Sequence, residues 1–529
     1  MADSVQYERE PAMDMAGEEF KKYGYQVVDW IANYLDHVGD LPVLSQVSPD
    51  QIKRSQPDHA PQRGESMEQL LADVDRVILP GVTHWNHPAF FAYFAISGSA
   101  PGILGEMLAA ALNVNAMMWR TSPAATELEE VTVSWLRKLI GLPDGFDGVI
   151  YDTASISTLV AIAAAREAVP CLRVREEGLA GPIITAAAGT IRGEKVASSG
   201  LPPRLRLYCS EHAHSSIDKA AITLGLGQAG VRKVQTDADF RMEPAALQQA
   251  INEDRAAGWL PFCAVATVGT TSTTSIDPVR AIADICQRES LWLHVDAAYG
   301  GSAAVVPEMR WVLEGAERSD SLVLNPHKWM FVPVDLSVLF CRRMDVLGRA
   351  FSLVPEYLRA PGADEVANFM DYGPQLGRRF RAIKLWFVLR YYGSEGLAER
   401  IRNHIQLAKE FAGWVDASEG FERMAPVPLS TVCFRARPRD LGQQSIIYRE
   451  SPDQCEVYLD KLNEALMANV NGEGKVFLSH TRLNGKFTLR LAIGNIRTAR
   501  KHVQLAWDVL RTEADRLDGT IRPAALSPG

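Results

Sequence analysis

The stretch Ser321-Leu322-Val323-Leu324-Asn325-Pro326-His327-Lys328-Trp329 contains a short apolar run that stops at a proline. Because proline cannot donate to a strand ladder, we expect a buried strand over 321–324 that ends at Asn325. Lys328 follows this strand end between apolar neighbours. Burial there disfavours the ammonium form, so the pKa of the lysine falls and its neutral amine can attack a carbonyl. Taken alone, Lys328 is better explained as a surface lysine in a loop.

A second strand ends upstream, in the segment Leu291-Trp292-Leu293-His294-Val295-Asp296-Ala297-Ala298-Tyr299-Gly300-Gly301. The segment reads as an apolar strand that ends in one carboxylate and is followed by small residues. A buried aspartate needs a partner, and no basic residue adjoins Asp296 in the sequence. An aspartate and a lysine at the ends of successive strands fit the binding of pyridoxal phosphate (PLP). The carboxylate pairs with the protonated pyridine nitrogen and the lysine holds the aldehyde.

Short apolar runs alternate with helical patterns between residues 148 and 324. We expect strands over 148–151, 204–209, 231–235, 261–268, 291–295 and 321–324, and helices over 157–169, 214–224 and 277–287. Helices that separate short buried strands imply right-handed crossovers and a mainly parallel sheet, so the predicted fold class is α/β. Ligands of such sheets bind at the carboxyl ends of the strands. Asp296, Lys328 and residues 269–271 all follow expected strand ends.

Two glycine- or hydroxyl-rich stretches could bind phosphate groups. Small hydroxyl residues over 152–158 lead into a helix, where free backbone N–H groups suit a phosphate, although a plain N-cap is the better explanation for this stretch taken alone. Residues 225–230 match the G-x-G-x-x-G pattern of dinucleotide-binding proteins. That pattern is meaningful only between a strand and a helix. Here it follows a helix and precedes a strand, so we expect no nicotinamide cofactor.

The two ends of the chain differ from this central part. Helices are expected over 16–38, 66–78, 101–112 and 123–140, and the first two have little of their own to pack against. We therefore predict an N-terminal helical dimerisation flap over 1–99, a large domain over 100–385 and a small α+β domain over 386–529. Towards the C-terminus we expect helices over 377–392, 398–417, 452–470 and 499–515, strands over 428–436, 475–480 and 487–492, and a disordered tail from Asp518.

Composition argues against several classes of function. The 529 residues carry a formal net charge of −9 without a long Lys/Arg run, which argues against nucleic-acid binding. The seven cysteines include no C-x-x-C pair, so neither a disulfide framework nor a zinc site is expected. Pro88 excludes a regular helix around His84 and His87, and we expect no metal. The N-terminus is polar and the most apolar window contains Glu106 and Asn115, so we expect a cytoplasmic protein without a membrane span.

Four short motifs occur together: Asn325-Pro326-His327-Lys328-Trp329, His294-Val295-Asp296-Ala297-Ala298-Tyr299, Ala213-His214-Ser215-Ser216 and Leu376-Gly377-Arg378-Arg379-Phe380-Arg381. The combination resembles the group II PLP-dependent decarboxylases, most nearly the aromatic-L-amino-acid decarboxylases, over about residues 16–510. The resemblance implies a fold-type I (aspartate-aminotransferase-like) homodimer whose active site lies at the dimer interface. It also implies pyridoxal 5′-phosphate as the cofactor and a small amino acid as the substrate.

The same resemblance implies a role for each candidate site residue. Lys328 would hold the cofactor as a Schiff base, and Asp296 would pair with the pyridine nitrogen. His214 would stack on one face of the ring, with Ala298 on the other. Phosphate- or ring-anchoring positions would be Ala154, Ser155, Asn325 and His327, with Thr271 at the hydroxyl edge and Asp277 as a supporting carboxylate.

Tyr357 resembles the loop tyrosine that protonates the carbanion left after CO₂ departs in these decarboxylases. A general acid at such a point contributes on the order of 10²–10⁴-fold. The residue therefore favours an amine product. Related aldehyde synthases, in which this tyrosine is replaced, form an aldehyde, ammonia and peroxide and are the alternative, as are a PLP-dependent aminotransferase or lyase and a protein without enzymatic activity.

The resemblance also implies an aromatic substrate pocket. Trp85, Tyr93 and Phe94 match its aromatic wall, whereas Ile96 stands where the animal enzymes have a hydroxyl residue. Asn115, Met117 and Val334 replace other wall positions, and Gly377 leaves room for an indole. We expect an L-aromatic substrate (Phe, Tyr, Trp or DOPA), with a large aliphatic amino acid as the alternative.

Overall fold

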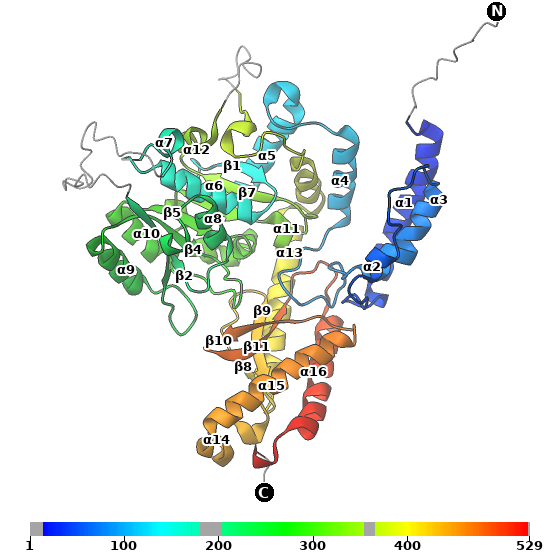
Figure 1. The fold of residues 1–529 in the computed structure, drawn as a ribbon, viewed down its shortest axis with the longest axis vertical. Coiled ribbons are helices and arrows are strands. Elements are labelled where there is room, and N and C mark those ends of the chain that lie inside the picture. Colours follow the sequence, from blue (N-terminus) through cyan, green and yellow to red (C-terminus); the bar gives the residue numbers. More distant parts are fainter. Residues whose placement is uncertain (1–13, 171, 180–202, 354–365, 527–529) are drawn as a thin grey trace, which may run out of the picture.

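A seven-stranded sheet forms the centre of the protein. The computed structural model describes residues 14–170, 172–179, 203–353 and 366–526 (Figure 1). The strand order is β1 (Asp147–Tyr151), β7 (Ser337–Cys341), β6 (Ser321–Leu324), β5 (Trp292–Asp296), β4 (Trp259–Thr267), β2 (Arg204–Ser210) and β3 (Val231–Val234). The strands from β6 to β3 are parallel, and β7 is antiparallel to both of its neighbours. The predicted α/β class with a mainly parallel sheet is confirmed.

Helices cover both faces of this sheet, because alternate residues of its buried strands point to opposite sides. One face packs against α6 (Ala154–Glu167), α8 (Ser216–Thr223) and α12 (Met344–Phe351). The other packs against α5 (Pro123–Leu139), α9 (Pro244–Ala256), α10 (Val279–Glu289) and α13 (Ala382–Asp416). Strand β7 and helix α9 are not among the elements that the sequence predicts.

A second, antiparallel sheet lies towards the C-terminus, in the order β10 (Ser479–Leu483), β11 (Lys486–Ala492), β9 (Thr431–Ala436) and β8 (Phe421–Arg423). It packs with α15 (Pro452–Gly472) and α16 (Arg500–Ile521), next to the short α14 (Ile446–Glu450) (Figure 1). The strand expected over 475–480 is wrong in its bounds, since β10 begins at Ser479 and ends at Leu483. The tail expected to be disordered from Asp518 is also wrong within the described residues, because α16 continues to Ile521 and Leu526 is buried.

Helix α13 connects the two parts of the molecule. It spans 382–416 and changes direction at Gly393, whose φ of 65° is a left-handed conformation that glycine adopts without strain. Gly393 divides this element into two helical parts, as expected from the predicted helices over 377–392 and 398–417, but the first part begins five residues later than expected. The proposed boundary between 385 and 386 lies within this helix, and the division into three domains stays a prediction.

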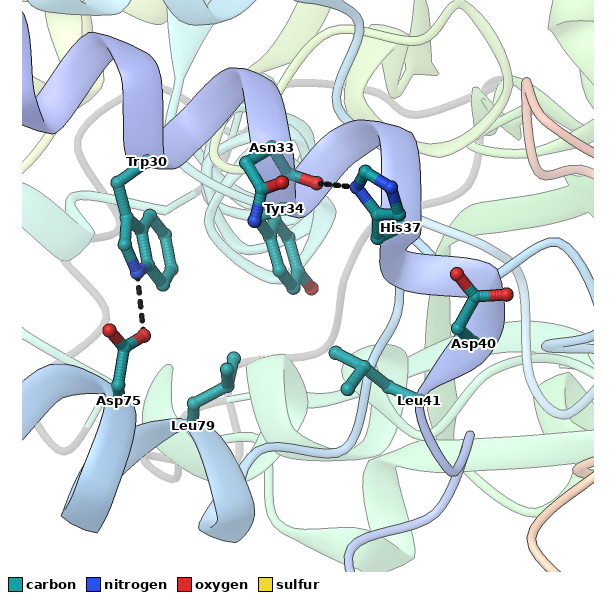
Figure 2. A pocket seen from close by; sticks show the side chains of 8 residues that line it. All are labelled: Trp30, Asn33, Tyr34, His37, Asp40, Leu41, Asp75 and Leu79. Atoms are coloured by element: carbon teal, nitrogen blue, oxygen red, sulfur yellow. Dashed lines mark hydrogen bonds between the residues drawn. The ribbon is translucent and has the colours of Figure 1, made fainter.

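The N-terminal helices form an arm beside the main body (Figure 1). The arm contains α1 (Gly17–His37), α2 (Gln51–Arg54) and α3 (Met67–Asp73), and α4 (Ala100–Leu112) follows it. Tyr23 is the one buried residue of α1. A cavity of about 150 Å³ lies between α1 and residues 75–79, where the Trp30 indole donates to Asp75 at 2.7 Å (Figure 2). None of the helices in the described part of the chain is both long and apolar enough to cross a membrane.

Candidate active site

The carboxyl ends of three parallel strands meet at one edge of the large sheet. Thr267 of β4 is in register with Asp296 of β5, and Asp296 pairs with the neighbouring strand β6. β6 ends where Pro326 begins the short helix α11 (Pro326–Trp329), which carries Lys328. The aspartate and the lysine that the sequence singles out therefore follow adjacent strands at the same edge.

Lys328 lies beside an aromatic ring and interacts electrostatically with Asp296. Its Nζ is 5.6 Å from the centroid of the Phe94 ring. Burial lowers the pKa of Lys328, as expected from the sequence, and the carboxylate of Asp296 acts in the opposite direction. A larger fraction of neutral amine at neutral pH follows from the lowered pKa, and the neutral form is the one that attacks a carbonyl.

Two carboxylates shape the ends of β4 and β5. Asp296 is 6% exposed, and its Oδ1 accepts the backbone N–H of Ala298 at 3.2 Å. Asp277 accepts the backbone N–H groups of Met242 and Thr267, each at 2.7 Å. Burial raises the pKa of Asp277 to about 7, against the effect of these two donors. Asp277 thus holds the backbone at the end of β4, while Asp296 lies at the end of β5.

His214 precedes α8 and faces the same site. Its Nδ1 accepts the backbone N–H of Ser216 at 3.1 Å, so the proton of the neutral ring is on Nε2. Desolvation lowers the pKa of His214, and the charge of Lys328 lowers it further. Ala154 and Ser155 open α6, where the first N–H groups have no partner within a helix.

The arrangement of Asn325 and His327 fits a cofactor that carries an anionic group. His327 Nδ1 accepts the backbone N–H of Leu336 at 2.9 Å, and burial lowers the pKa of this histidine to about 4, so its proton is on Nε2. That Nε2 faces Asn325 Nδ2 at 3.4 Å, while the buried Oδ1 of Asn325 has no partner among the described residues. With the amide turned so that Oδ1 accepts from His327 Nε2, the side-chain NH₂ of Asn325 is free to donate to an acceptor such as a phosphate.

Thr271 lies in a turn that a buried arginine holds. Arg490 of β11 is 4% exposed and donates to the carbonyls of Thr271 and Ser272, each at 2.7 Å, and to Ser479 Oγ at 2.9 Å. Its guanidinium carbon lies 5.6 Å from the centroid of the Phe94 ring. Sequence reasoning did not single out Arg490. The signal was present, since an arginine inside a mostly apolar strand, Phe487-Thr488-Leu489-Arg490-Leu491-Ala492, needs an internal partner.

Phe94 is the aromatic wall residue that the structure brings to Lys328. Trp85 and Tyr93 stack on each other with centroids 5.7 Å apart, and Tyr93 is 52% exposed. Ile96 follows on the same segment and is half-buried, and Val334 is 54% exposed. The described contacts join Lys328 to Phe94 and do not join it to Trp85, Tyr93 or Ile96.

Asn115, Met117 and Gly377 form a separate group around Arg378. The Asn115 side chain accepts the backbone N–H of Arg378 at 2.9 Å and donates to Met117 Sδ at 3.4 Å. The buried Arg378 guanidinium donates to Glu129 at 2.6 Å and to the carbonyl of Ile150 at 2.7 Å. Nothing lies within 4 Å of a Cβ built on Gly377. Both polar ends of the Asn115 amide are thus already used inside this chain.

Three other sequence expectations concern Tyr357, the histidines at 84 and 87, and the glycine-rich stretch over 225–230. Tyr357 lies outside the described residues. His84 contacts the Tyr34 hydroxyl at 3.0 Å, and His87 accepts the Ala89 backbone N–H at 2.9 Å. Among the described residues no group of three or more His, Cys, Asp or Glu side chains could hold a metal. Residues 225–230 lie between α8 and β3, as expected, and not between a strand and a helix.

Comparison with known proteins gives a consistent family. Residues 49–437 match the model of the pyridoxal-dependent decarboxylase conserved domain. The chain is 41% identical to a phenylacetaldehyde synthase of Arabidopsis thaliana (95% of this chain, 97% of that protein). It is 38% identical to an aromatic-L-amino-acid decarboxylase of Rattus norvegicus (94% and 98%). The crystal structure of Oryza sativa TDC with PLP and tryptamine superposes with a TM-score of 0.86 at 34% identity, covering 96% of this chain and all of that one.

Proposed function

Because this chain belongs to the pyridoxal-dependent decarboxylases and is a PLP-dependent carboxy-lyase, we propose that it converts L-aromatic amino acids into the arylethylamine and CO₂. One observation carries the aromatic preference: the Phe94 ring lies 5.6 Å from Lys328 Nζ. A flat side chain of a bound amino acid gains most from such a wall, because stacked or edge-to-face ring pairs add about 0.5–1.5 kcal/mol to apolar burial. The relatives include decarboxylases of aromatic amino acids, which supports the same substrate class.

PLP, when bound, supplies an aldehyde that combines with the substrate amine and a pyridine ring that accepts the electron pair left by CO₂. Lys328 would hold the cofactor aldehyde, and its lowered pKa keeps part of the amine neutral for that attachment. The carboxylate of Asp296 would hold the proton on the pyridine nitrogen. Asn325 and the first N–H groups of α6 at Ala154 and Ser155 would bind the phosphate.

The remaining residues would orient the cofactor ring and the substrate. His214 carries its proton on Nε2 and would lie over one face of the ring, with Ala298 below the other. Thr271, in the turn that Arg490 fixes, would bind at the hydroxyl edge. Tyr357, by its place in the sequence, would deliver a proton to Cα after CO₂ has left, which gives the amine.

A panel of L-amino acids with added PLP tests this function. We expect CO₂ and the matching amine in equal amounts from Phe, Tyr, Trp or DOPA, little release from Leu or Met, and no stoichiometric peroxide. In Tyr357→Phe the missing phenolic proton should lower amine formation by about 10²–10⁴-fold and raise aldehyde and peroxide relative to CO₂. If the unmodified enzyme released peroxide and CO₂ in equal amounts, the activity would instead be that of an aldehyde synthase, the activity for which the Arabidopsis relative is named.

We also propose a homodimer. Large apolar side chains stay exposed on the arm and on α4: Phe20, Tyr25, Val28, Leu104, Met107, Leu108 and Leu112. Several exposed apolar side chains on the same helices are typical of protein–protein contacts. Removing residues 1–80 should therefore convert the dimer into a monomer, as measured by light scattering. A truncated protein that stays fully dimeric would contradict the role of the arm.

A cytoplasmic location is part of the proposal. The six cysteines of the described residues are all free and buried. Free thiols persist in a reducing compartment, whereas secreted proteins tend to oxidise them.

A further inference from the structure

Lys328 and the aromatic wall are joined by three stacked rings, Phe94, Tyr299 and Trp329, called here the ring column. Phe94 stacks on Tyr299 with centroids 3.7 Å apart and an interplanar angle of 9°. Tyr299 stacks on Trp329 at 4.7 Å and 7°. Lys328 borders both ends of this column, because Phe94 lies 5.6 Å from its Nζ and Trp329 is the next residue in the chain.

The Trp329 end of the column is fixed by one side chain of α13. The indole Nε1–H of Trp329 donates to His404 Nδ1 at 3.0 Å, and His404 is 2% exposed. Burial lowers the pKa of His404 to about 4, with the backbone of Asn495 acting in the opposite direction. The ring is therefore neutral, with Nδ1 as the acceptor and the proton on Nε2, directed at the Asn495 backbone.

Asn495 continues this connection to the aromatic wall. Its side chain is fully buried and donates from Nδ2 to the backbone carbonyls of Trp85 at 2.9 Å and His87 at 3.0 Å. The segment that begins with Trp85 also carries Phe94. Two routes thus join the wall to Trp329, one through the stacked rings and one through His404 and Asn495.

We propose that His404 is a positioning residue. By holding the Trp329 indole, it fixes the position of the neighbouring Lys328 relative to the aromatic wall. The inference rests on the proposed function in one respect, that the wall receives the substrate side chain. A neutral imidazole is suited to the task, because it accepts one hydrogen bond and donates another in a dry core. Small displacements of a reacting group have large effects on rate, about 10²-fold for 1 Å.

A purely structural role makes a different prediction. If His404 only satisfies the indole N–H, losing it costs stability and leaves the chemistry of Lys328 unchanged. The test therefore needs a readout at Lys328 itself. The rate at which added PLP becomes attached to Lys328 of the apoprotein supplies it, followed by absorbance and by mass spectrometry after borohydride reduction.

His404→Phe keeps a ring of similar shape and removes both hydrogen bonds. We expect it to slow PLP attachment and to lower kcat for CO₂ release by about 10-fold or more, with a smaller change in KM. His404→Gln, which again offers an acceptor and a donor, should recover most of the loss. Trp329→Phe keeps a stacked ring without the N–H and should show the same loss, and the double variant should be no worse than either single one.

Tyr458→Phe is the matched control, since it removes the hydrogen bond of 2.6 Å that the partly buried Tyr458 hydroxyl of α15 donates to Asp518 of α16. It should lower Tm and leave attachment and kcat unchanged. The proposal would be overturned if His404→Phe lost Tm like the control but kept the attachment rate and kcat of the wild type. It would also be overturned if the losses of the two single variants multiplied in the double variant. If His404→Phe does not fold, Trp329→Phe decides by the same attachment rate. The attachment rate also keeps this test separate from the proposed substrate class, which fails only if wild-type enzyme releases no CO₂ from aromatic amino acids.

Discussion

Lys328→Ala is expected to lose the covalent attachment of PLP and at least ~10⁴-fold in the rate of CO₂ release. The reason is proximity, since a positioned group reacts as if present at about 10⁵ M or more, and this amine lies at the strand edge next to Asp296 with a lowered pKa. The measurements are the visible absorbance of the PLP-treated protein and the release of CO₂. An added small primary amine should restore part of the activity.

Lys409→Ala provides the control, because the Lys409 side chain is exposed on α13. It should keep the absorbance and the rate of the unmodified enzyme. A Lys328→Ala protein that still bound PLP covalently at a single lysine and released CO₂ would show that another amine does this work.

Asp296→Asn is expected to lower kcat/KM by about 10²–10⁴-fold. The substitution keeps the size of the side chain and removes its charge, so the pyridine nitrogen loses the carboxylate that would hold its proton. Removing one partner of a buried charged pair costs about 3–5 kcal/mol, and each 1.36 kcal/mol in the barrier is about ten-fold in rate. The absorbance of bound PLP as a function of pH should show the same loss of ring protonation.

Asp320→Asn is a matched control on the same sheet. Asp320 accepts the backbone N–H of Leu293 at 2.9 Å, at the end of β5 opposite Asp296. It should change stability and leave both kcat/KM and the pH titration of the cofactor unaltered. Activity of Asp296→Asn within about 3-fold of wild type would contradict the role of Asp296, because that is less than 1.36 kcal/mol.

Most of the parallel strands could be predicted because each is a short apolar run that ends in a turn or polar residue. Strand β7 departs from this pattern, since it follows an irregular segment and pairs antiparallel with both β6 and β1 in an otherwise parallel sheet. The helix expected from 377 begins at Ala382 for a tertiary reason. The backbone of Arg378 bonds to Ala116 and its guanidinium to Glu129 and Ile150, and these contacts outcompete helix propensity.

The tail was misjudged for a similar reason. Beyond Asp518 the composition is polar, yet Arg522 is paired with Asp518 at 2.6 Å and also with Asp440. The buried Leu526 then closes the end of the C-terminal core. A partner 82 positions away in the chain, as Asp440 is from Arg522, leaves no pattern in a local window.

The order of a strand, an aspartate, a second strand and a lysine is written in the sequence, and it determined the chemistry to expect. Strand ends are local features, fixed by apolar runs, prolines and small residues, and adjacent parallel strands end at the same edge. Only the tertiary structure decided that Phe94 lies over Lys328, that Arg490 holds the turn of Thr271, and that His404 holds Trp329. Those contacts join residues that are between 75 and more than 200 positions apart. They depend on how whole helices and sheets pack, which no periodicity along the chain encodes.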